Sequence, residues 1–269
     1  MDRPRYLPQA DRLSTLAATI LLAYAISRFI EMEPRTLALQ LPGVYLDLQI
    51  NVYTVVSFLV IGLTAAGADW LLRDHPAIGG HSSIEHWLLP ALTAWVIGQP
   101  LFNLPIGPLW WAGFVLGGGL IMLVLVAEYI AVDPDDVRQP AAAAGLTAVS
   151  FALYLALLVE LRVEELRLFQ LLPLLALGAG LVSLRTFHLR LHLWAFVEAG
   201  LIAFLVAQVG AALFYWRISP ASYGLLVLGP SYGLTSLIGS LADGESWRQS
   251  LVEPILVLLV VWGAAFWLR

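Results

Sequence analysis

The chain contains nine apolar stretches, each long enough to cross a lipid bilayer, and together they make up most of its 269 residues. A helix that crosses the hydrocarbon core, which is about 30 Å thick, needs roughly 20 residues. Hydrophobic residues are 60% of the chain and charged residues 12%, far from the balance of a globular domain. The sequence therefore predicts an all-α, polytopic membrane protein in a single transmembrane domain. The predicted spans are 13–30, 52–72, 86–104, 109–132, 141–161, 168–187, 193–216, 222–242 and 254–268.

Two of these spans allow a second interpretation. Arg3, Arg5 and Arg12 precede an apolar run that contains Ala23-Tyr24-Ala25, which has the form of a signal peptide with its cleavage site. The run continues to Ile30, so we interpret it as a retained first helix. The eighth span is interrupted by Gly229, Pro230 and Gly233. It is either a kinked span or a re-entrant loop, and a re-entrant loop would reverse the side of the C-terminus.

The arginines give the orientation, because the chain contains no lysine. Positive residues are enriched on the cytoplasmic side of membrane proteins, and the group nearest the N-terminus usually dominates. With the N-terminus inside, eight arginines lie on the cytoplasmic side and six outside. We therefore predict a multi-pass protein of the bacterial cytoplasmic (inner) membrane with a cytoplasmic N-terminus. The bacterial source rests on the complete use of Arg in place of Lys, which is typical of a GC-rich genome.

An internal repeat is suggested by two segments that match at a constant offset of 112 residues. Residues 98–117 align with residues 210–229, and eight of the twenty positions are identical, including Pro108 with Pro220. Both segments run from the end of one span through a proline turn into the next. The pattern predicts two parallel four-helix halves, 1–132 and 133–244, followed by an extra helix at 252–269.

The histidines are the main candidates for metal binding. All five lie in or beside two predicted cytoplasmic loops: His75, His81 and His86 in the first, His188 and His192 in the second. Imidazole and carboxylate groups are ordinary ligands of zinc or iron, and two histidines four residues apart share one helical face. The alternative is that these rings are simply well placed at the membrane interface. No cofactor is predicted, although His188, His192, His81 and His86 are the residues that would hold a metal or haem.

Few charged residues lie within the predicted spans, and these are the candidates for transport. Glu198 is the acid placed most deeply, about a quarter of the way along its span, whereas Arg28, Asp69 and Glu128 lie near span ends. Ionisable groups in lipid are costly and usually face protein or water, so Glu198, Arg28 and Asp69 are candidate transport residues. The alternative is that Glu198 reaches the interface or pairs with Arg185 or Arg190.

Missing residue types exclude several classes of function. Without lysine there is no retinal or pyridoxal Schiff base and no Walker nucleotide loop. Without cysteine there is no disulfide, no thiolate nucleophile and no ordinary iron–sulfur cluster. No catalytic residue can be named, so the sequence points away from an enzyme.

Two resemblances bear on function. Residues 210–233, with a Tyr-Trp-Arg-Ile-Ser-Pro turn and a glycine-rich span after it, resemble an uncharacterised family of polytopic membrane proteins found mainly in green non-sulfur bacteria. This resemblance implies membrane location and no known activity. The nine-helix layout is also similar to that of the intramembrane prenyltransferases, which hold magnesium pyrophosphate with two aspartate-rich loops. Here the first loop offers only Asp69 and Asp74, and the second has no aspartate.

Three hypotheses of function remain. The leading one is a non-catalytic scaffold, assembly factor or subunit of a membrane complex, whose partners are lipid and other subunits or a second copy, with no nucleic acid. The second is a transporter or channel for a small solute or ion, which would depend on Glu198. The third is a membrane enzyme or metal protein that uses the two histidine loops, with any bound metal or haem lost when His188 and His192 are both replaced by alanine.

Overall fold

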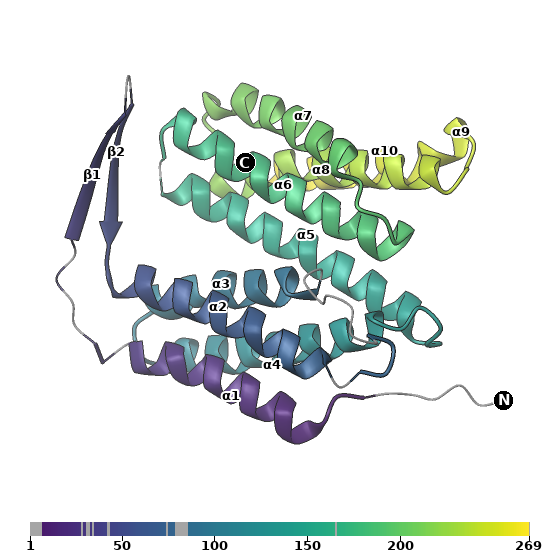
Figure 1. The fold of residues 1–269 in the computed structure, drawn as a ribbon. Helices are drawn as coiled ribbons and strands as arrows, with labels where there is room; N and C mark the ends of the chain where they lie inside the picture. The colour runs from purple at the N-terminus through teal and green to yellow at the C-terminus, as the bar shows by residue number, and fades with distance from the viewer. Residues whose placement is uncertain are drawn as a thin grey trace. The chain divides into compact units, whose positions relative to one another are not determined.

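The computed structural model describes residues 7–27, 29–30, 33, 35–41, 44–73, 75–78, 86–164 and 166–268. Within these residues the fold is helical, as predicted, with one short antiparallel hairpin that the sequence analysis did not predict (Figure 1). The chain divides into two compact units, Met1–Ala142 (unit 1) and Ala143–Arg269 (unit 2). The elements are α1 (Ala10–Ser27), β1 (Arg35–Leu41), β2 (Val44–Ile50), α2 (Val52–Leu72), α3 (Leu88–Asn103), α4 (Pro108–Ala131), α5 (Gln139–Val163), α6 (Leu168–Leu191), α7 (Phe196–Phe214), α8 (Pro220–Ala242), α9 (Trp247–Ser250) and α10 (Val252–Trp267).

Several helices begin where the sequence provides a cap. The side chain of Asn51 accepts a hydrogen bond of 2.9 Å from the backbone N–H of Thr54 and so caps α2. Ser219 caps α8 by accepting from the N–H of Ser222 at 3.1 Å. These bonds satisfy backbone donors that have no partner in the first turn of a helix. Both α4 and α8 begin with proline, which has no N–H to satisfy there.

Unit 1 is a group of four helices around its own apolar core. Helices α1, α2 and α3 pack against one another, and α4 packs against all three. The centre of the core contains Ile20 of α1, Val60 of α2, Ala94 of α3 and Ile121 of α4, all fully buried. Because the apolar residues on one side of each helix face this core, the other side is left for lipid.

The hairpin of β1 and β2 lies between α1 and α2. Its register pairs Arg35 with Ile50 at the open end and Leu41 with Val44 at the turn. The strand β2 ends at Ile50, and only the capping residue Asn51 separates it from α2. In Figure 1 the two strands run across the direction of the unit 1 helices instead of continuing along it.

Unit 2 contains α5 to α10 around a second core. Helix α6 packs against α7 and α8, and α10 packs against α8. Its centre contains Leu158 of α5, Leu175 of α6, Ile202 of α7 and Tyr223 of α8, each fully buried. Like unit 1, this unit buries a compact apolar interior of its own.

Seven helical segments in the described part of the chain are long and apolar enough to cross a membrane, compared with nine predicted spans. The first and third predicted spans correspond to α1 and α3, which do not meet this standard. Helix α3 has 16 residues and is therefore about 24 Å long, whereas α1 carries Asp11 and Arg12 in its first turns. The described residues thus agree with a multi-pass helical membrane protein, with seven helices of this kind where nine spans were predicted.

Of the last two spans, the eighth agrees with its prediction and the ninth begins earlier. Helix α8 runs without interruption from Pro220 to Ala242, through Gly229, Pro230 and Gly233, and is long enough to cross. A continuous helix of this length, with Pro230 inside it, agrees with the interpretation of the segment as a span. The final span begins earlier than predicted, because Trp247–Trp267 forms one apolar segment.

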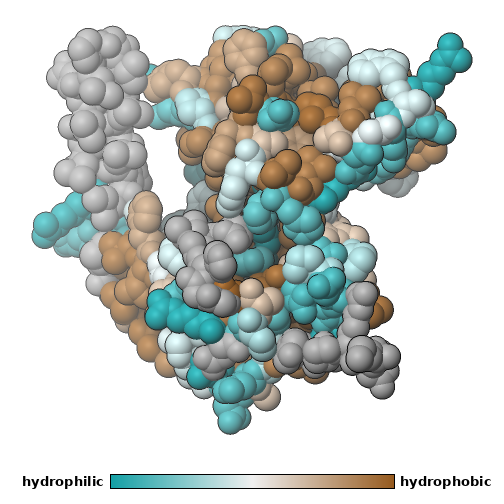
Figure 2. All heavy atoms as spheres, turned by 45° about the vertical axis from the view of Figure 1, so that its right-hand side comes forward, coloured by the Kyte–Doolittle hydropathy of each residue, from teal (hydrophilic) through white to brown (hydrophobic). Residues whose placement is uncertain are grey.

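Both units expose large apolar side chains. In Figure 2 hydrophobic residues cover part of the helix surface in view, beside hydrophilic ones. Exposed side chains include Phe58 of α2, Leu116 of α4, Phe204 of α7 and Leu259 of α10, each more than half exposed. Such a surface is unfavourable in water and is the surface expected of helices that face lipid.

Candidate functional site

A cluster of buried polar side chains lies at one end of unit 1. It consists of His75, His86, Glu128 and Tyr129, and we call it the polar cluster. His75 follows the C-terminal end of α2, His86 precedes the N-terminal end of α3, and the other two residues lie one turn before the end of α4. The antiparallel course of α2, α3 and α4 brings these three helix ends together, although the residues are far apart in sequence.

The central contact of the polar cluster joins His86 to Glu128. The Nδ1 atom of His86 lies 2.7 Å from Oε2 of Glu128, and the two residues are 8% and 1% exposed. Burying a carboxylate is unfavourable unless it is paired or hydrogen-bonded. The imidazole is therefore an essential partner of this acid, whichever of the two carries the proton.

His75 is the second buried imidazole of the polar cluster. Its Nδ1 atom accepts a hydrogen bond of 3.1 Å from the N–H of Ala77, and its ring meets the ring of Tyr129 edge-on at 4.6 Å. Burial lowers the pKa of His75 below its ordinary value of 6.5. The carboxylates of Asp133 and Asp136 act in the opposite direction, and His86 lowers the pKa further.

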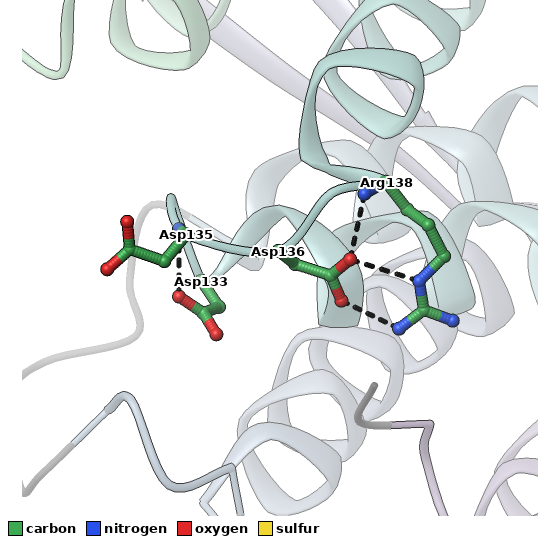
Figure 3. Close-up of polar contacts among 4 residues, drawn as sticks. All are labelled: Asp133, Asp135, Asp136 and Arg138. Carbon is green, nitrogen blue, oxygen red and sulfur yellow. Dashed lines mark hydrogen bonds and ion pairs between the residues drawn. The ribbon is translucent and has the colours of Figure 1, made fainter. Parts of the chain in front are cut away.

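The loop that follows α4 contains three aspartates next to this cluster (Figure 3). Asp136 is buried and is bound by Arg138, whose backbone N–H and Nε donate to Oδ1 at 2.8 and 3.1 Å and whose Nη2 donates to Oδ2 at 2.7 Å. The Asp136 carboxylate raises the pKa of Arg138. Asp133 accepts a hydrogen bond of 3.0 Å from the N–H of Asp135. Asp136 is thus neutralised by an arginine, unlike an aspartate that is free to hold a magnesium ion.

The predicted transport residue Glu198 is exposed. It lies in the first turn of α7, at the start of the span Phe196–Phe214 and not deep inside it. A negative charge there interacts favourably with the helix dipole. Its proposed partner Arg190 donates instead to Asp243, with Nε 2.6 Å from Oδ2. Among the described residues, the most deeply buried acid is Glu128 and not Glu198.

The other transport candidates are placed as follows. Asp69 lies in the last turn of α2 and forms an ion pair of 2.6 Å with Arg73, four residues further along the chain. This pair is largely exposed on the arginine side. Arg28 lies outside the described residues.

The predicted metal ligands that the structure describes do not come together. The ring of His188 stacks on Trp194 at 4.6 Å, and α6 ends at Leu191, so that His192 has left-handed backbone geometry (φ 54°) and is exposed. The two residues therefore do not share a helical face. His81 lies outside the described residues, and His86 is engaged with Glu128. Within the described residues, no group of three or more His, Asp or Glu side chains is arranged to hold a metal ion.

Two buried charged residues were underestimated from the sequence. Glu128 is the one charged residue of the 24-residue helix α4, and this isolation in an apolar helix was the signal available. Arg185 of α6 is 2% exposed, although the sequence suggested only a pairing role near the interface. Burial of each depends on neighbouring helices, so hydropathy alone did not distinguish them from Glu198.

The helices, their length and their lipid-facing surfaces define a multi-pass helical membrane protein. Residues 32–268 match the family model described as "Protein of unknown function (DUF5656)", and the chain belongs to this family. This agrees with the resemblance to an uncharacterised membrane protein family. No curated protein matches the chain. No solved structure matches it either.

Proposed function

We propose that the protein is a non-catalytic component of the membrane: a scaffold, an assembly factor or a subunit of a larger complex. The observation that supports this most is the use of polar side chains inside the helices. Many of them bond to backbone carbonyls of neighbouring helices and therefore hold the bundle together. A side chain used in this way is not available to bind a substrate.

In unit 1 these bonds join α1 to α3 and α3 to α4. The hydroxyl of Tyr24 donates to the carbonyl of Ala94, and Nε1 of Trp110 donates to the carbonyl of Leu101 at 2.9 Å. Both donors are buried. Hydrogen bonds between helices are a main source of attraction in lipid, where the hydrophobic effect no longer drives helices together.

Unit 2 uses the same kind of bond. The hydroxyl of Tyr154 donates to the carbonyl of Leu175 at 3.1 Å and thereby joins α5 to α6. Helices α8 and α10 are joined twice, by Ser222 to the carbonyl of Ala265 at 2.9 Å and by Trp262 to that of Leu226 at 3.2 Å. The pattern supports a rigid frame in each unit.

Nine membrane crossings remain our proposal despite the short α3. The His86–Glu128 contact links the start of α3 to the end of α4, and the Trp110–Leu101 bond links the opposite ends of the same two helices. Helix α3 therefore extends alongside α4, which is long enough to cross. We base a location in the bacterial inner membrane, with a cytoplasmic N-terminus, on the distribution of the arginines and the absence of lysine, and this orientation puts the polar cluster on the cytoplasmic side.

The internal repeat is likewise a proposal, with support from similar bonds at nearby positions in the two halves. At the offset of 112 residues, α3 and α4 correspond to α7 and α8, and the prolines that begin α4 and α8 coincide. Trp110 in the first turn of α4 bonds back to α3, and Tyr223 in the first turn of α8 bonds back to Gly210 of α7 at 3.2 Å. Two halves of four helices and one extra helix are consistent with this arrangement.

The test is purification of the tagged protein from its native membrane in a mild detergent, with native mass and visible absorption recorded on one sample. A complex subunit is expected to migrate with a stoichiometric protein partner, well above the 29.4 kDa of the chain, and without a chromophore. A colourless monomer would count against the proposal. An absorbing species whose colour is lost in the double variant His188→Ala, His192→Ala would instead favour the metal or haem alternative.

Ion transport is a second candidate, and the His86–Glu128 contact favours it. Ionisable groups buried in a membrane bundle often mark the path of an ion or proton. The test is proton flux in proteoliposomes that contain a pH-sensitive dye, with an imposed membrane potential. A transporter should lose flux in Glu128→Gln and keep it in Glu198→Gln, whose carboxylate is exposed. Equal flux in protein-free liposomes would rule out this candidate.

A further inference from the structure

The hairpin of β1 and β2 has two faces of opposite character. In an antiparallel pair, residues directly opposite each other lie on the same face of the sheet, and the face alternates along each strand. The register therefore assigns every residue of the hairpin to a face. One face, which we call the leucine face, contains Leu37, Leu39, Leu41, Val44, Leu46, Leu48 and Ile50, with Arg35 at its open end. The other, the polar face, contains Thr36, Ala38, Gln40, Tyr45, Asp47 and Gln49.

This separation requires something to cover the leucine face. Seven apolar residues on one side of two strands form an amphipathic surface, and an isolated two-stranded sheet is only marginally stable in water. The strands pair with each other along their whole length, and β2 contacts α2 where it leads into that helix. Whatever covers the leucine face must therefore be present at the place where α2, a membrane helix, begins.

The hairpin is continuous with the lipid-facing surface on both sides. Before it, Phe29 and Ile30, which follow α1, are 79% and 50% exposed, and after it Val55 and Phe58 of α2 are 48% and 72% exposed. Asn51, between the hairpin and these residues of α2, caps the helix. Exposed apolar residues thus lie within five residues of the hairpin on both sides, as expected of an element at the level where the bilayer begins.

The direction of the strands agrees with this position. In Figure 1 they run across the helices of unit 1, as an element lying along the membrane surface would. Each strand has seven residues and is about 23 Å long, so a strand along the helix direction would project well away from the bilayer.

We propose that the hairpin lies in the membrane interface, with the leucine face in the acyl region of the lipid and the polar face towards water. The polar face carries Asp47 and no basic residue, so this binding depends on apolar contact and not on attraction to anionic headgroups. The hairpin is then an interfacial membrane-binding element formed from strands.

The absence of cysteine from the chain makes the test direct, because each variant contains a single reactive thiol. Leu39→Cys and Leu46→Cys report on the leucine face, and Gln40→Cys and Gln49→Cys are the matched controls on the polar face. Each is labelled with an environment-sensitive fluorophore and reconstituted in phosphatidylcholine vesicles. Variants are used only if their native mass equals that of the parent protein, and two sites on each face protect the test against loss of one.

In the vesicles, the two leucine-face probes should be quenched several-fold more by doxyl-labelled lipid than the polar-face probes. Iodide in the water should quench in the reverse order, and adding anionic lipid should change neither result. Equal iodide quenching on both faces would overturn the proposal. So would leucine-face probes that are shielded from both quenchers at high protein-to-lipid ratio and lose this shielding on dilution, because a second copy of the chain would then be the cover.

Discussion

His86 and Glu128 are 42 residues apart in sequence, yet Nδ1 of the imidazole lies 2.7 Å from Oε2 of the carboxylate in the interior of unit 1. The contact fixes the start of α3 against the end of α4. It also explains how a chain so poor in charge can keep an acid that is 1% exposed.

Removing one member of this pair should be strongly destabilising. Glu128→Ala leaves a buried imidazole without its carboxylate, and His86→Ala leaves a buried acid without its imidazole, so each should cost about 3–5 kcal/mol. The measurement is unfolding in detergent, monitored by tryptophan fluorescence. The double variant should lose less free energy of unfolding than the two single variants added together, because each single variant already removes the same interaction.

The matched control for these variants is the ion pair between Asp69 and Arg73. Its arginine is 73% exposed, so Asp69→Asn should change the free energy of unfolding by only about 0–1 kcal/mol. A loss at Asp69 as large as that at Glu128 would contradict the role assigned to burial.

Stability should fall with acidification, in part through His75. Its pKa is lowered in the folded protein by burial, so the unfolded chain takes up its proton first as the pH drops through 6.5. The stabilisation that comes from burying neutral His75 is present above this pH and is lost below it. The unfolding temperature should therefore decrease less between neutral and mildly acidic pH in His75→Asn than in the parent protein. An identical pH dependence in the two proteins would show that His75 makes no contribution.

Two glycines should be intolerant of a methyl group. A Cβ on Gly98 would lie 2.6 Å from the Tyr24 ring, and one on Gly210 would lie 2.6 Å from the end of Leu175. Overpacking of this kind costs about 1–3 kcal/mol. Gly98→Ala should cost more than Gly210→Ala, because a ring is rigid and the end of a leucine can turn.

Gly62→Ala is the control for both, since no neighbouring atom lies within 4 Å of a Cβ at that position. It should be neutral or slightly stabilising, because alanine has the higher helix propensity. Thermal unfolding of the three variants under one condition gives the comparison. Equal losses at all three positions would mean that packing is not the cause.

Single cysteines can also test the proposed topology. Glu164→Cys, after α5, is expected outside, and Asp135→Cys, before α5, inside. A membrane-impermeant maleimide should therefore label the first in intact cells and the second only after lysis. The reverse pattern would invert the orientation, and labelling of both from outside would mean that α5 does not cross.

The alternating pattern of the hairpin was overlooked beside the stronger apolar pattern of the membrane helices on either side. Leucines at 37, 39 and 41 and again at 46 and 48 alternate with more polar residues, which is the pattern of a strand with one buried face. The signal was present, but the segment is short and lies between two apolar helices. Only the register of the strands showed that both sets of leucines share one face.

By itself, the sequence determined that the chain is a helical membrane protein and where most of its spans lie, because length and hydropathy are local properties that set the cost of leaving water. It also placed the histidines near two helix ends. The tertiary structure decided which charged groups are buried: Glu128 is buried against His86, whereas Glu198 is exposed at a helix end. Burial depends on which faces of distant helices meet, and no window of the sequence contains that information.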